Sequence, residues 1–179
     1  MALTCGVLYG IVRTLICDKY YKAMIIGRND ELKKLRATMD SDKSEFVAVY
    51  GRRRIGKTFL IRQAYGSFAF EHTGLRKRGM AKQLEEFARS LSHQGYPKCP
   101  KPKDWYEAFD LLRESLLGKG EGRKVIFLDE CPWMDTAKSD FVGALDHFWN
   151  GWASARMDIV LVICGSATSW VIEKIVDDY

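Results

Sequence analysis

The segment from Gly51 to Thr58 places two glycines, a lysine and a hydroxyl group at spacings that suit phosphate binding. It reads Gly-Arg-Arg-Arg-Ile-Gly-Lys-Thr and satisfies every fixed position of the pattern G-x-x-x-x-G-K-[ST]. The two glycines let the backbone turn tightly, so that successive N–H groups approach phosphate oxygens. Lys57 supplies a positive charge to the β- and γ-phosphates, and the Thr58 hydroxyl is a ligand for Mg²⁺. The segment therefore predicts a phosphate-binding loop; the alternative is a basic surface turn.

The three arginines of this loop occupy its variable positions. They form either a solvated rim or a contact in which one guanidinium reaches a phosphate or the acidic surface of a partner, because arginine suits bidentate binding of anions. The residue types do not single out one of the three. The predicted nucleotide-binding positions are Gly51, Arg52, Arg53, Arg54, Ile55, Gly56, Lys57, Thr58 and Phe59.

Two neighbouring carboxylates, Asp129 and Glu130, follow the apolar run 125–128. Open α/β sheets bind their ligands at the carboxyl ends of the strands, so both side chains are expected to face the bound phosphates. Asp129 is expected to hold Mg²⁺ through its water, and Glu130 to orient and deprotonate the attacking water as a general base. The alternative is that the two acids merely begin a polar loop.

A polar segment, residues 164–169, follows the last apolar run. Ser166 is our choice for a side chain that bonds the γ-phosphate or the water beside Glu130, which makes it a predicted catalytic residue together with Glu130 and Lys57. The alternative is that Thr168 or Ser169 only caps the helix that follows.

Positive charge is concentrated around the predicted loop. The chain has 28 Lys and Arg against 23 Asp and Glu, a formal net charge of +5, and residues 51–78 alone hold eight basic side chains against the single acid Glu71. A local excess of this kind favours an anion site over a general coat for nucleic acid. A nucleic-acid-binding module that uses residues 52–78 remains an alternative.

Composition excludes several classes of protein. The chain of 179 residues is 47% hydrophobic and 12% aromatic, which excludes a disordered protein. Its five cysteines include no pair at the C-x₂₋₄-C spacing of a zinc module and favour a reducing compartment, so we expect a cytoplasmic protein. Cys131 and Cys164 are interpreted as small buried thiols. No run of 18 apolar residues is present, so no membrane span is expected.

Apolar runs alternate with helical patterns along the chain. Strands are expected over residues 46–50, 67–71, 124–128 and 159–163, and helices over residues 29–39, 57–65, 80–94, 104–117, 139–152 and from 168 onward. Strands that are apolar throughout and alternate with helices predict a parallel sheet covered on both faces, which is an α/β fold. Asn29, Asp104 and Ser139 are expected to cap helices, with Glu107 completing a capping-box-like start at Asp104.

Residues 1–23 fit poorly with this regular pattern. The apolar run 5–17 is broken by Arg13 and lacks both a basic start and a cleavage site, so it is not interpreted as a signal peptide. These residues are expected to be an extension or an upstream start, with the domain beginning at Met24.

Taken together, these segments resemble the AAA+-like P-loop ATPases of the archaeal-type ATPase family, which is close to the STAND class. The resemblance covers residues 24–179, including the Walker A and Walker B motifs at the loop and the acidic pair. It rests on IIGRNDELKKL (25–35), VYGRRRIGKTFLIRQ (49–63), VIFLDECPWMD (125–135), FWNGWA (148–153) and LVICGSATSW (161–170).

The resemblance implies a three-layer parallel sheet of the ASCE or AAA+-like kind. In that sheet the strand ending in Ser166 lies between the loop strand and the strand ending in Asp129. It also implies ATP and Mg²⁺ as cofactors and Glu130 as the catalytic acid of the pair. Gly27 and Arg28 match a family segment that lies near the adenine.

Members of this family continue past the fourth core strand with a fifth strand, a helical lid and a C-terminal domain. We therefore expect residues 24–179 to be the nucleotide-binding part alone, with the outer edge of the loop strand unpaired. An effector domain and further copies of the chain are the expected partners. An arginine supplied by a lid or a partner contributes about 10³–10⁵ in rate, so this chain alone is expected to hydrolyse ATP slowly.

The sequence thus favours an ATPase domain that binds Mg-ATP and, in the complete protein, hydrolyses it to switch or drive an effector domain. A small-molecule kinase or other phosphotransferase on the same core is the enzymatic alternative. A glutamate directly after Asp129, placed to activate water, argues for hydrolysis.

Overall fold

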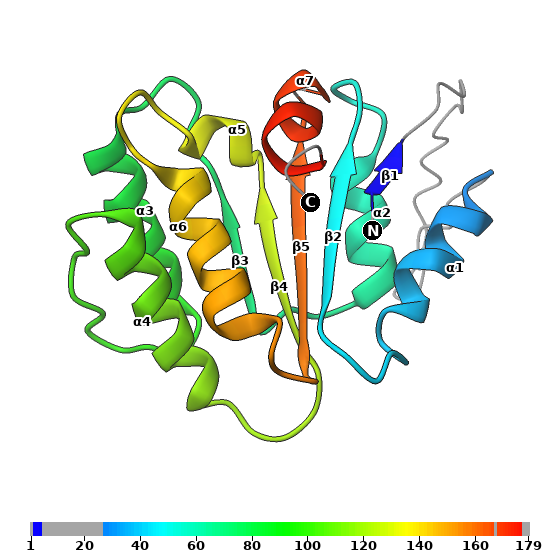
Figure 1. Ribbon diagram of the computed structural model, residues 1–179, viewed down its shortest axis with the longest axis horizontal. Coiled ribbons are helices and arrows are strands. Elements are labelled where there is room, and N and C mark those ends of the chain that lie inside the picture. Colours follow the sequence, from blue (N-terminus) through cyan, green and yellow to red (C-terminus); the bar gives the residue numbers. More distant parts are fainter. Residues whose placement is uncertain (1, 5–26, 167, 177–179) are drawn as a thin grey trace, which may run out of the picture.

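A parallel β-sheet forms the centre of the protein (Figure 1). The computed structural model describes residues 2–4, 27–166 and 168–176, so the expectations for residues 5–26, including a domain start at Met24, fall outside them. The strands lie in the order β1-β2-β5-β4-β3, and each neighbouring pair is parallel. Their bounds are β1 (Ala2–Thr4), β2 (Glu45–Tyr50), β3 (Phe70–Thr73), β4 (Lys124–Asp129) and β5 (Ile159–Gly165).

Strand β5 lies between β2 and β4, as the resemblance implied. Tyr50 at the end of β2 is in register with Gly165 at the end of β5, and Leu128 of β4 is in register with Ile163. All three strands run in the same direction, so their carboxyl ends emerge together at one edge of the sheet. The residues that follow these ends are therefore neighbours in space.

Strand β3 begins later than predicted. The expected strand covered residues 67–71, whereas the observed one runs from Phe70 to Thr73 and pairs with β4. Gly66, with φ of 73°, ends the preceding helix, and pairing starts only where the Ala69 N–H donates to the Val125 carbonyl (2.8 Å). The contact with β4, and not the local apolar pattern, decides where this strand lies.

The outer edge of β2 is paired over three residues. Ala2, Leu3 and Thr4 of β1 are in register with Ala48, Val49 and Tyr50. The expectation that this edge has no partner is therefore wrong at these positions, because residues from the start of the chain supply one.

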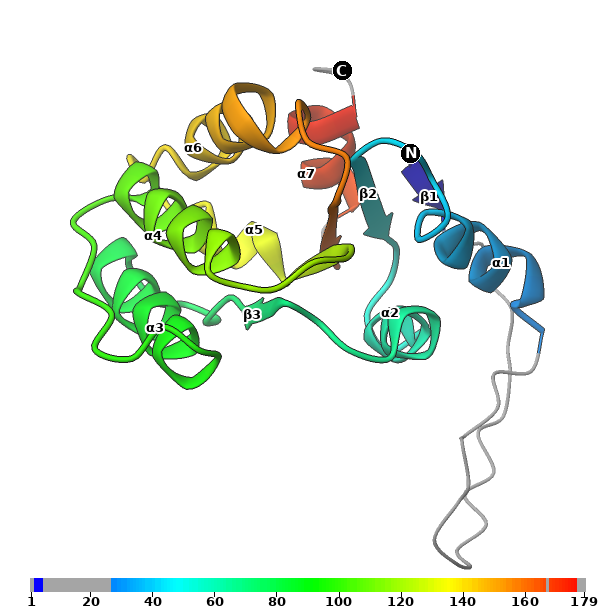
Figure 2. The ribbon, with the colours of Figure 1, turned by 90° about the horizontal axis from the view of Figure 1, so that it is seen from below.

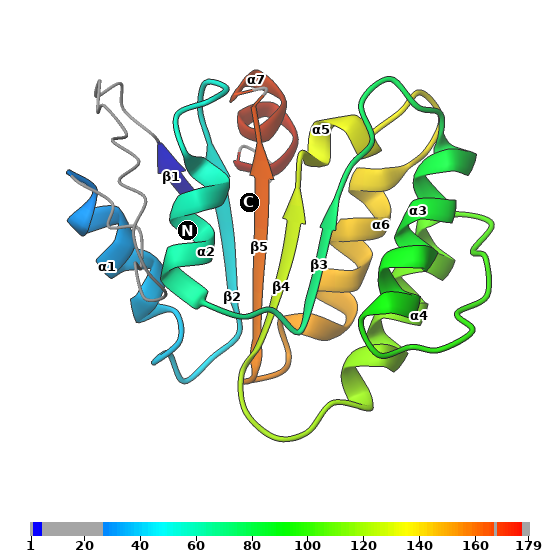
Figure 3. The same cartoon turned by 180° about the vertical axis from the view of Figure 1, so that it is seen from behind.

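Helices cover both faces of the sheet, which makes the predicted three layers (Figures 2 and 3). Helices α1 and α2 lie on one face, and α3, α4 and α6 lie on the other. The helical segments are α1 (Asn29–Ala37), α2 (Lys57–Tyr65), α3 (Met80–His93), α4 (Trp105–Leu117), α5 (Cys131–Met134), α6 (Phe141–Phe148), the π-helical η1 (Trp149–Ala153), α7 (Thr168–Val171) and η2 (Ile172–Val176).

Alternate residues of the central strands belong to two separate cores. In β5, Val160 and Val162 pack with Leu60 of α2, while Leu161 and Ile163 belong to the larger core under α4 and α6. Every residue of β4 and β5 is buried. The prediction of a parallel sheet covered on both faces is confirmed.

One of the three predicted helix caps is confirmed. The Asp104 side chain accepts from the Glu107 N–H (2.8 Å) at the start of α4. Asn29 instead lies inside α1, which begins after Arg28. The N-cap position of α6 is Asp140 and not Ser139; the Asp140 side chain makes no capping bond and instead accepts a hydrogen bond from the Tyr106 hydroxyl (2.8 Å).

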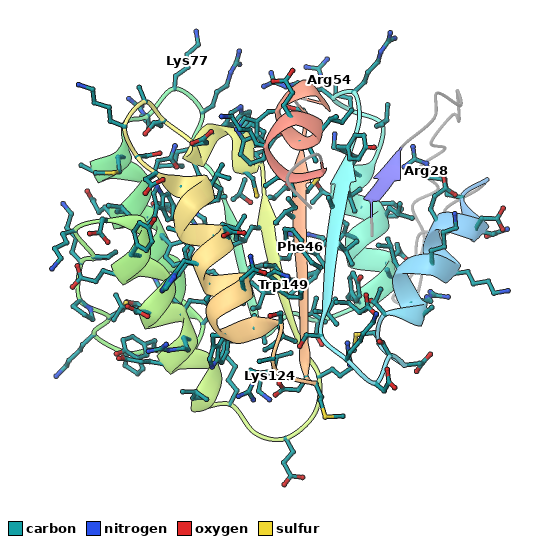
Figure 4. All side chains as sticks on the ribbon, viewed as in Figure 1. Arg28, Phe46, Arg54, Lys77, Lys124 and Trp149 are labelled. Atoms are coloured by element: carbon teal, nitrogen blue, oxygen red, sulfur yellow. The ribbon has the colours of Figure 1, made fainter. Side chains whose placement is uncertain are left out.

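The aromatic side chains of residues 148–152 lie in or against the larger core. Phe148 and Trp149 are buried, and Trp149 stacks on Phe46 of β2 at a centroid distance of 5.2 Å (Figure 4). Trp152 packs against Phe148 (5.3 Å).

Two ion pairs lie where β4 and β5 begin. The Lys124 ammonium at the start of β4 lies 2.8 Å from Asp158, just before β5 (Figure 4). Arg156 donates to both oxygens of the same carboxylate (2.7 and 2.8 Å). The Arg156 hydrogen bonds, with help from Lys124, hold the pKa of Asp158 far below its usual range.

No helix among the described residues is both long enough and apolar enough to cross a bilayer.

Strand β3 carries a buried histidine. His72 is 3% exposed and lies beside Phe87, with its Nδ1 2.9 Å from the Ser90 hydroxyl. Burial lowers the pKa of His72 from 6.5 to about 4, against a smaller opposing effect of Glu86. The folded protein thus keeps this ring neutral.

We expect His72 to make folding stability depend on pH. The unfolded chain takes up a proton near pH 6.5 and the folded chain only near pH 4, so the contribution is present above pH 6.5 and is lost as the pH falls toward 4. At pH 5 the free energy of unfolding is expected to be lower by about 2 kcal/mol because of His72. Urea denaturation at pH 7 and pH 5 measures it. His72→Asn should remove this part of the pH dependence, whereas the exposed control His93→Asn should not; equal losses in wild type and His72→Asn would contradict the assignment.

Candidate functional site

The candidate site lies at the carboxyl edge of the sheet, where three strands end side by side (Figure 1). The loop 51–58 follows β2, the pair Asp129 and Glu130 closes β4, and Ser166 follows β5. The parallel direction of the strands and the order β2-β5-β4 bring together residues that are far apart in the sequence. The predicted catalytic and metal-binding residues are all found here.

The 51–58 loop has a backbone that needs its second glycine. Gly56 has φ of 80° and stands at the N-terminus of α2, with no side chain capping that end. A Cβ atom built on Gly56 would meet nothing within 4 Å, so the space beside this backbone is open. A helix start with uncapped N–H groups and an adjoining open space fits an anion such as a phosphate.

Lys57 is buried with its ammonium turned back onto the loop. Its side chain donates to the carbonyls of Gly51 (2.9 Å) and Arg52 (3.0 Å), and the residue is 7% exposed. An ammonium has three protons, so a third hydrogen bond can go to a ligand. These bonds hold the positive charge within the turn of the loop.

Thr58 and Asp129 form the first of two hydroxyl–carboxylate pairs. The Thr58 hydroxyl donates to Asp129 Oδ2 (2.8 Å), and Asp129 Oδ1 accepts from the Glu130 N–H (2.9 Å). These hard oxygen donors fit Mg²⁺, which is usually bound through one or two protein oxygens with waters and phosphates completing its shell. No group of three or more His, Cys, Asp and Glu side chains in the described part of the chain is arranged to hold a metal.

Glu130 and Ser166 form the second pair. The Ser166 hydroxyl lies 3.0 Å from Glu130 Oε2 and donates to it. Glu130 itself adopts a left-handed backbone conformation (φ 51°, ψ 43°), which costs about 1–2 kcal/mol for a residue with a side chain. This conformation turns the chain sharply from β4 into α5, and strain of this kind is common at functional sites.

Of the three loop arginines, the structure singles out Arg53. Its Nε donates to the Ser166 hydroxyl (3.1 Å), and its guanidinium lies 5.3 Å from the centre of the Trp133 ring. All three arginines are exposed, but no side-chain hydrogen bond is found for Arg52 or Arg54 among the described residues; Figure 4 shows Arg54 at the upper edge. The contact between Trp133 and Arg53 was not predicted from the sequence. The position of Trp133 one helical turn after Glu130 was the available signal.

The remaining predicted positions are less closely connected to the site. Ile55 is half-buried, and Phe59 is 41% exposed on the first turn of α2. Gly27 (φ 87°) is exposed and Arg28 precedes α1, and within the described residues no hydrogen bond joins either to the 51–58 loop. Their role near an adenine stays a prediction.

The two cysteines beside the site are buried, as predicted. Cys131 and Cys164 are 0% and 1% exposed, and burial raises the pKa of both thiols. The charge of Asp129 raises the pKa of Cys164 further. Both groups stay protonated at neutral pH and are therefore poor nucleophiles.

Comparison with known proteins identifies the family of this chain. A family described as an ATPase domain predominantly from Archaea matches residues 25–178. An uncharacterized protein of Methanocaldococcus jannaschii is 30% identical over 110 residues, which are 61% of this chain and 22% of that protein. An uncharacterized ATP-binding protein of the same organism is 39% identical over 44 residues, which are 25% of this chain and 75% of that protein.

A solved structure shares the fold. The Walker-type ATPase of Pyrococcus abyssi superposes with a TM-score of 0.58 at 15% identity, over 87% of this chain and 49% of that protein. This chain therefore spans about half the length of that ATPase and about a fifth of the first relative.

Proposed function

The chain belongs to the family of ATPase domains found predominantly in Archaea, and from this premise we propose that it binds Mg-ATP at the carboxyl edge of its sheet. In the complete protein, hydrolysis would switch or drive an attached effector domain. One observation carries the proposal: the Thr58–Asp129 and Glu130–Ser166 pairs lie side by side at the mouth of the 51–58 loop. A structural role alone does not require two hydroxyl–carboxylate pairs at the open edge of a sheet.

Binding of the triphosphate rests on the loop and the start of α2. The uncapped N–H groups after Gly56 favour an anion, and the helix dipole adds to their effect. Lys57 is held within the turn, where its charge would reach the β- and γ-phosphates. Thr58 and Asp129 would hold Mg²⁺, which neutralises charge on the phosphates when it is bound.

The proposed reaction needs a base, and we assign this role to Glu130. A water would attack the γ-phosphorus and give up a proton to the Glu130 carboxylate, while the bond from that phosphorus to the bridging oxygen breaks and ADP leaves with the electron pair. Ser166 already donates to one oxygen of Glu130 and would orient the carboxylate. General-base catalysis of this kind contributes about 10²–10⁴ in rate.

The test is a titration with a fluorescent ATP analogue, together with phosphate release measured without any acceptor molecule. Saturable, magnesium-dependent binding and Glu130-dependent release in the complete protein are expected. Release only when a small-molecule acceptor is added would instead identify the kinase alternative. Absence of saturable binding would contradict the proposal.

We expect Thr58→Val to abolish the magnesium dependence of nucleotide affinity. Valine keeps the shape of threonine but lacks the hydroxyl that bonds Asp129 (2.8 Å) and would ligate the metal. Titrations with and without Mg²⁺ measure the effect, and the expected ratio falls from about tenfold or more to near one, since one charge-assisted contact contributes about 1.5–3 kcal/mol. Thr58→Ser retains the hydroxyl and should behave as wild type. If the ratio of affinities with and without Mg²⁺ is unchanged in Thr58→Val, the metal is bound by other residues.

Nucleic-acid binding is a second candidate function, because exposed basic side chains lie at the same carboxyl edge of the sheet. Arg76, Lys77 and Arg78 are exposed in the loop after β3, and Figure 4 shows Lys77 at the upper edge that also carries Arg54. Binding of nucleic acid through these charges would weaken steeply with salt. A salt-dependent affinity for DNA that ATP does not change would favour this candidate.

The effector, and any assembly of several copies, are also proposals. The chain spans about half the length of the P. abyssi ATPase whose fold it shares. Co-purification of the complete protein with and without ATP, followed by size measurement, would show whether the nucleotide changes its assembly.

A further inference from the structure

Arg53 joins three separate segments at the site. It lies in the 51–58 loop, donates to Ser166 after β5 and covers Trp133 of α5. We propose that Arg53 is a positioning residue that orients the Ser166 hydroxyl, and through it Glu130, with Trp133 holding the guanidinium in place. This inference rests on the proposed function, because it assigns the orientation of the proposed base to these two side chains.

The direction of the hydrogen bonds follows from their chemistry. A guanidinium only donates, so the Ser166 oxygen must accept from Arg53 Nε at 3.1 Å. The one proton of the hydroxyl then goes to Glu130 Oε2 at 3.0 Å. Because the donor is charged, the chain of two bonds is polarised in one direction, which strengthens the second bond. Arg53 thereby selects one rotamer of a group that otherwise turns freely.

Trp133 holds the same arrangement from the other side. Its ring lies under the guanidinium at 5.3 Å, within range for a cation–π contact. Its backbone N–H donates to the Glu130 carbonyl (2.9 Å), so it also stabilises the sharp turn at Glu130. Glu130 is thus held by its side chain through Ser166 and by its backbone through the first turn of α5.

A competing role for Arg53 is direct contact with a phosphate. The two roles predict different kinetics. A phosphate contact contributes to binding, so its loss would weaken nucleotide affinity. A positioning residue acts on the orientation of the base, so its loss would lower kcat and leave KM nearly unchanged.

The experiment compares Arg53→Ala, Arg53→Lys, Trp133→Phe and Trp133→Ala in phosphate release by the complete protein. We expect Arg53→Ala to lower kcat about tenfold to a hundredfold with KM for Mg-ATP within about threefold of wild type. Lysine should rescue only in part, because it lacks the planar group that stacks on the indole. Trp133→Phe keeps an aromatic face and should stay near wild type, whereas Trp133→Ala should approach Arg53→Ala. Arg113→Ala is the matched control, because Arg113 is a partly exposed arginine that pairs with Asp110 on α4, away from the site.

A double variant separates positioning from a general structural effect. If Arg53 acts through Glu130, then adding Arg53→Ala to Glu130→Gln should cause no further loss of the residual rate. A multiplied loss would overturn the proposal, as would unchanged kcat in Arg53→Ala, or a loss of affinity of about tenfold or more with intact kcat. In each of those cases the nucleotide site itself would stand. If the wild-type protein releases no phosphate at all, that result contradicts the proposed hydrolysis and, with it, the positioning role of Arg53.

Discussion

Replacing Lys57 with alanine should weaken Mg-ATP binding at least about thirtyfold. Lys57 is 7% exposed and its ammonium donates to the carbonyls of Gly51 and Arg52, so its charge lies within the loop that would surround the phosphates. Charge-assisted hydrogen bonds contribute about 1.5–3 kcal/mol each, and about 2 kcal/mol corresponds to this loss of affinity. Titration with a fluorescent ATP analogue measures it directly.

The control for Lys57→Ala must separate binding from folding. Lys82→Ala removes an exposed lysine of α3 that pairs with Glu85 (2.8 Å), and it should leave affinity unchanged. Lys57→Met keeps the length and packing of the stem and should bind as poorly as Lys57→Ala. Thermal unfolding shows whether either variant is misfolded. Affinity equal to wild type in a folded Lys57→Ala would place the nucleotide somewhere else.

Glu130→Gln should retain nucleotide binding and lose turnover. Glutamine preserves the shape of the side chain and an oxygen that can accept from Ser166, but it cannot take a proton from water. We expect phosphate release by the complete protein to fall about 10²–10⁴-fold, with affinity within about threefold of wild type. Release under saturating nucleotide and a parallel titration provide the two values.

An exposed glutamate at the other edge of the sheet serves as the control for this variant. Glu121 lies in the loop before β4, and Glu121→Gln should not affect either measurement. Turnover that survives in Glu130→Gln would require another base, and Asp129 would be the next residue to test. Loss of nucleotide binding in Glu130→Gln would indicate that the carboxylate holds the metal or stabilises the 51–58 loop.

Features that depend on neighbours in the chain were predicted well. Helix α2 runs from Lys57 to Tyr65, as expected, because the glycine before it and the apolar spacing within it are local signals. The Asp104 cap was also predicted, because its partner Glu107 lies three residues away. The two buried thiols were also predicted, because no histidine lies at a spacing from them that would suit thiol chemistry.

Features that depend on distant contacts were predicted less well. The Asp140 carboxylate, at the N-cap position of α6, bonds Tyr106, which is 34 residues earlier, and not the start of its own helix; a search for the best local cap chose Ser139. The position of β3 is set by its pairing with β4. The edge partner β1 comes from residues that the resemblance leaves outside the domain. In each case a tertiary contact outweighs a weak local preference.

By itself, the sequence determined the chemical groups of the site and the local backbone that presents them: the Gly51–Thr58 loop, the acidic pair after an apolar strand and the serine after the next. Only the tertiary structure decided which of these groups meet. Thr58 and Asp129 are 71 residues apart, Glu130 and Ser166 are 36 apart, and Arg53 and Ser166 are 113 apart. The physical reason is that side-chain hydrogen bonds form over about 3 Å, and only strand order and register bring residues so distant in sequence within that range.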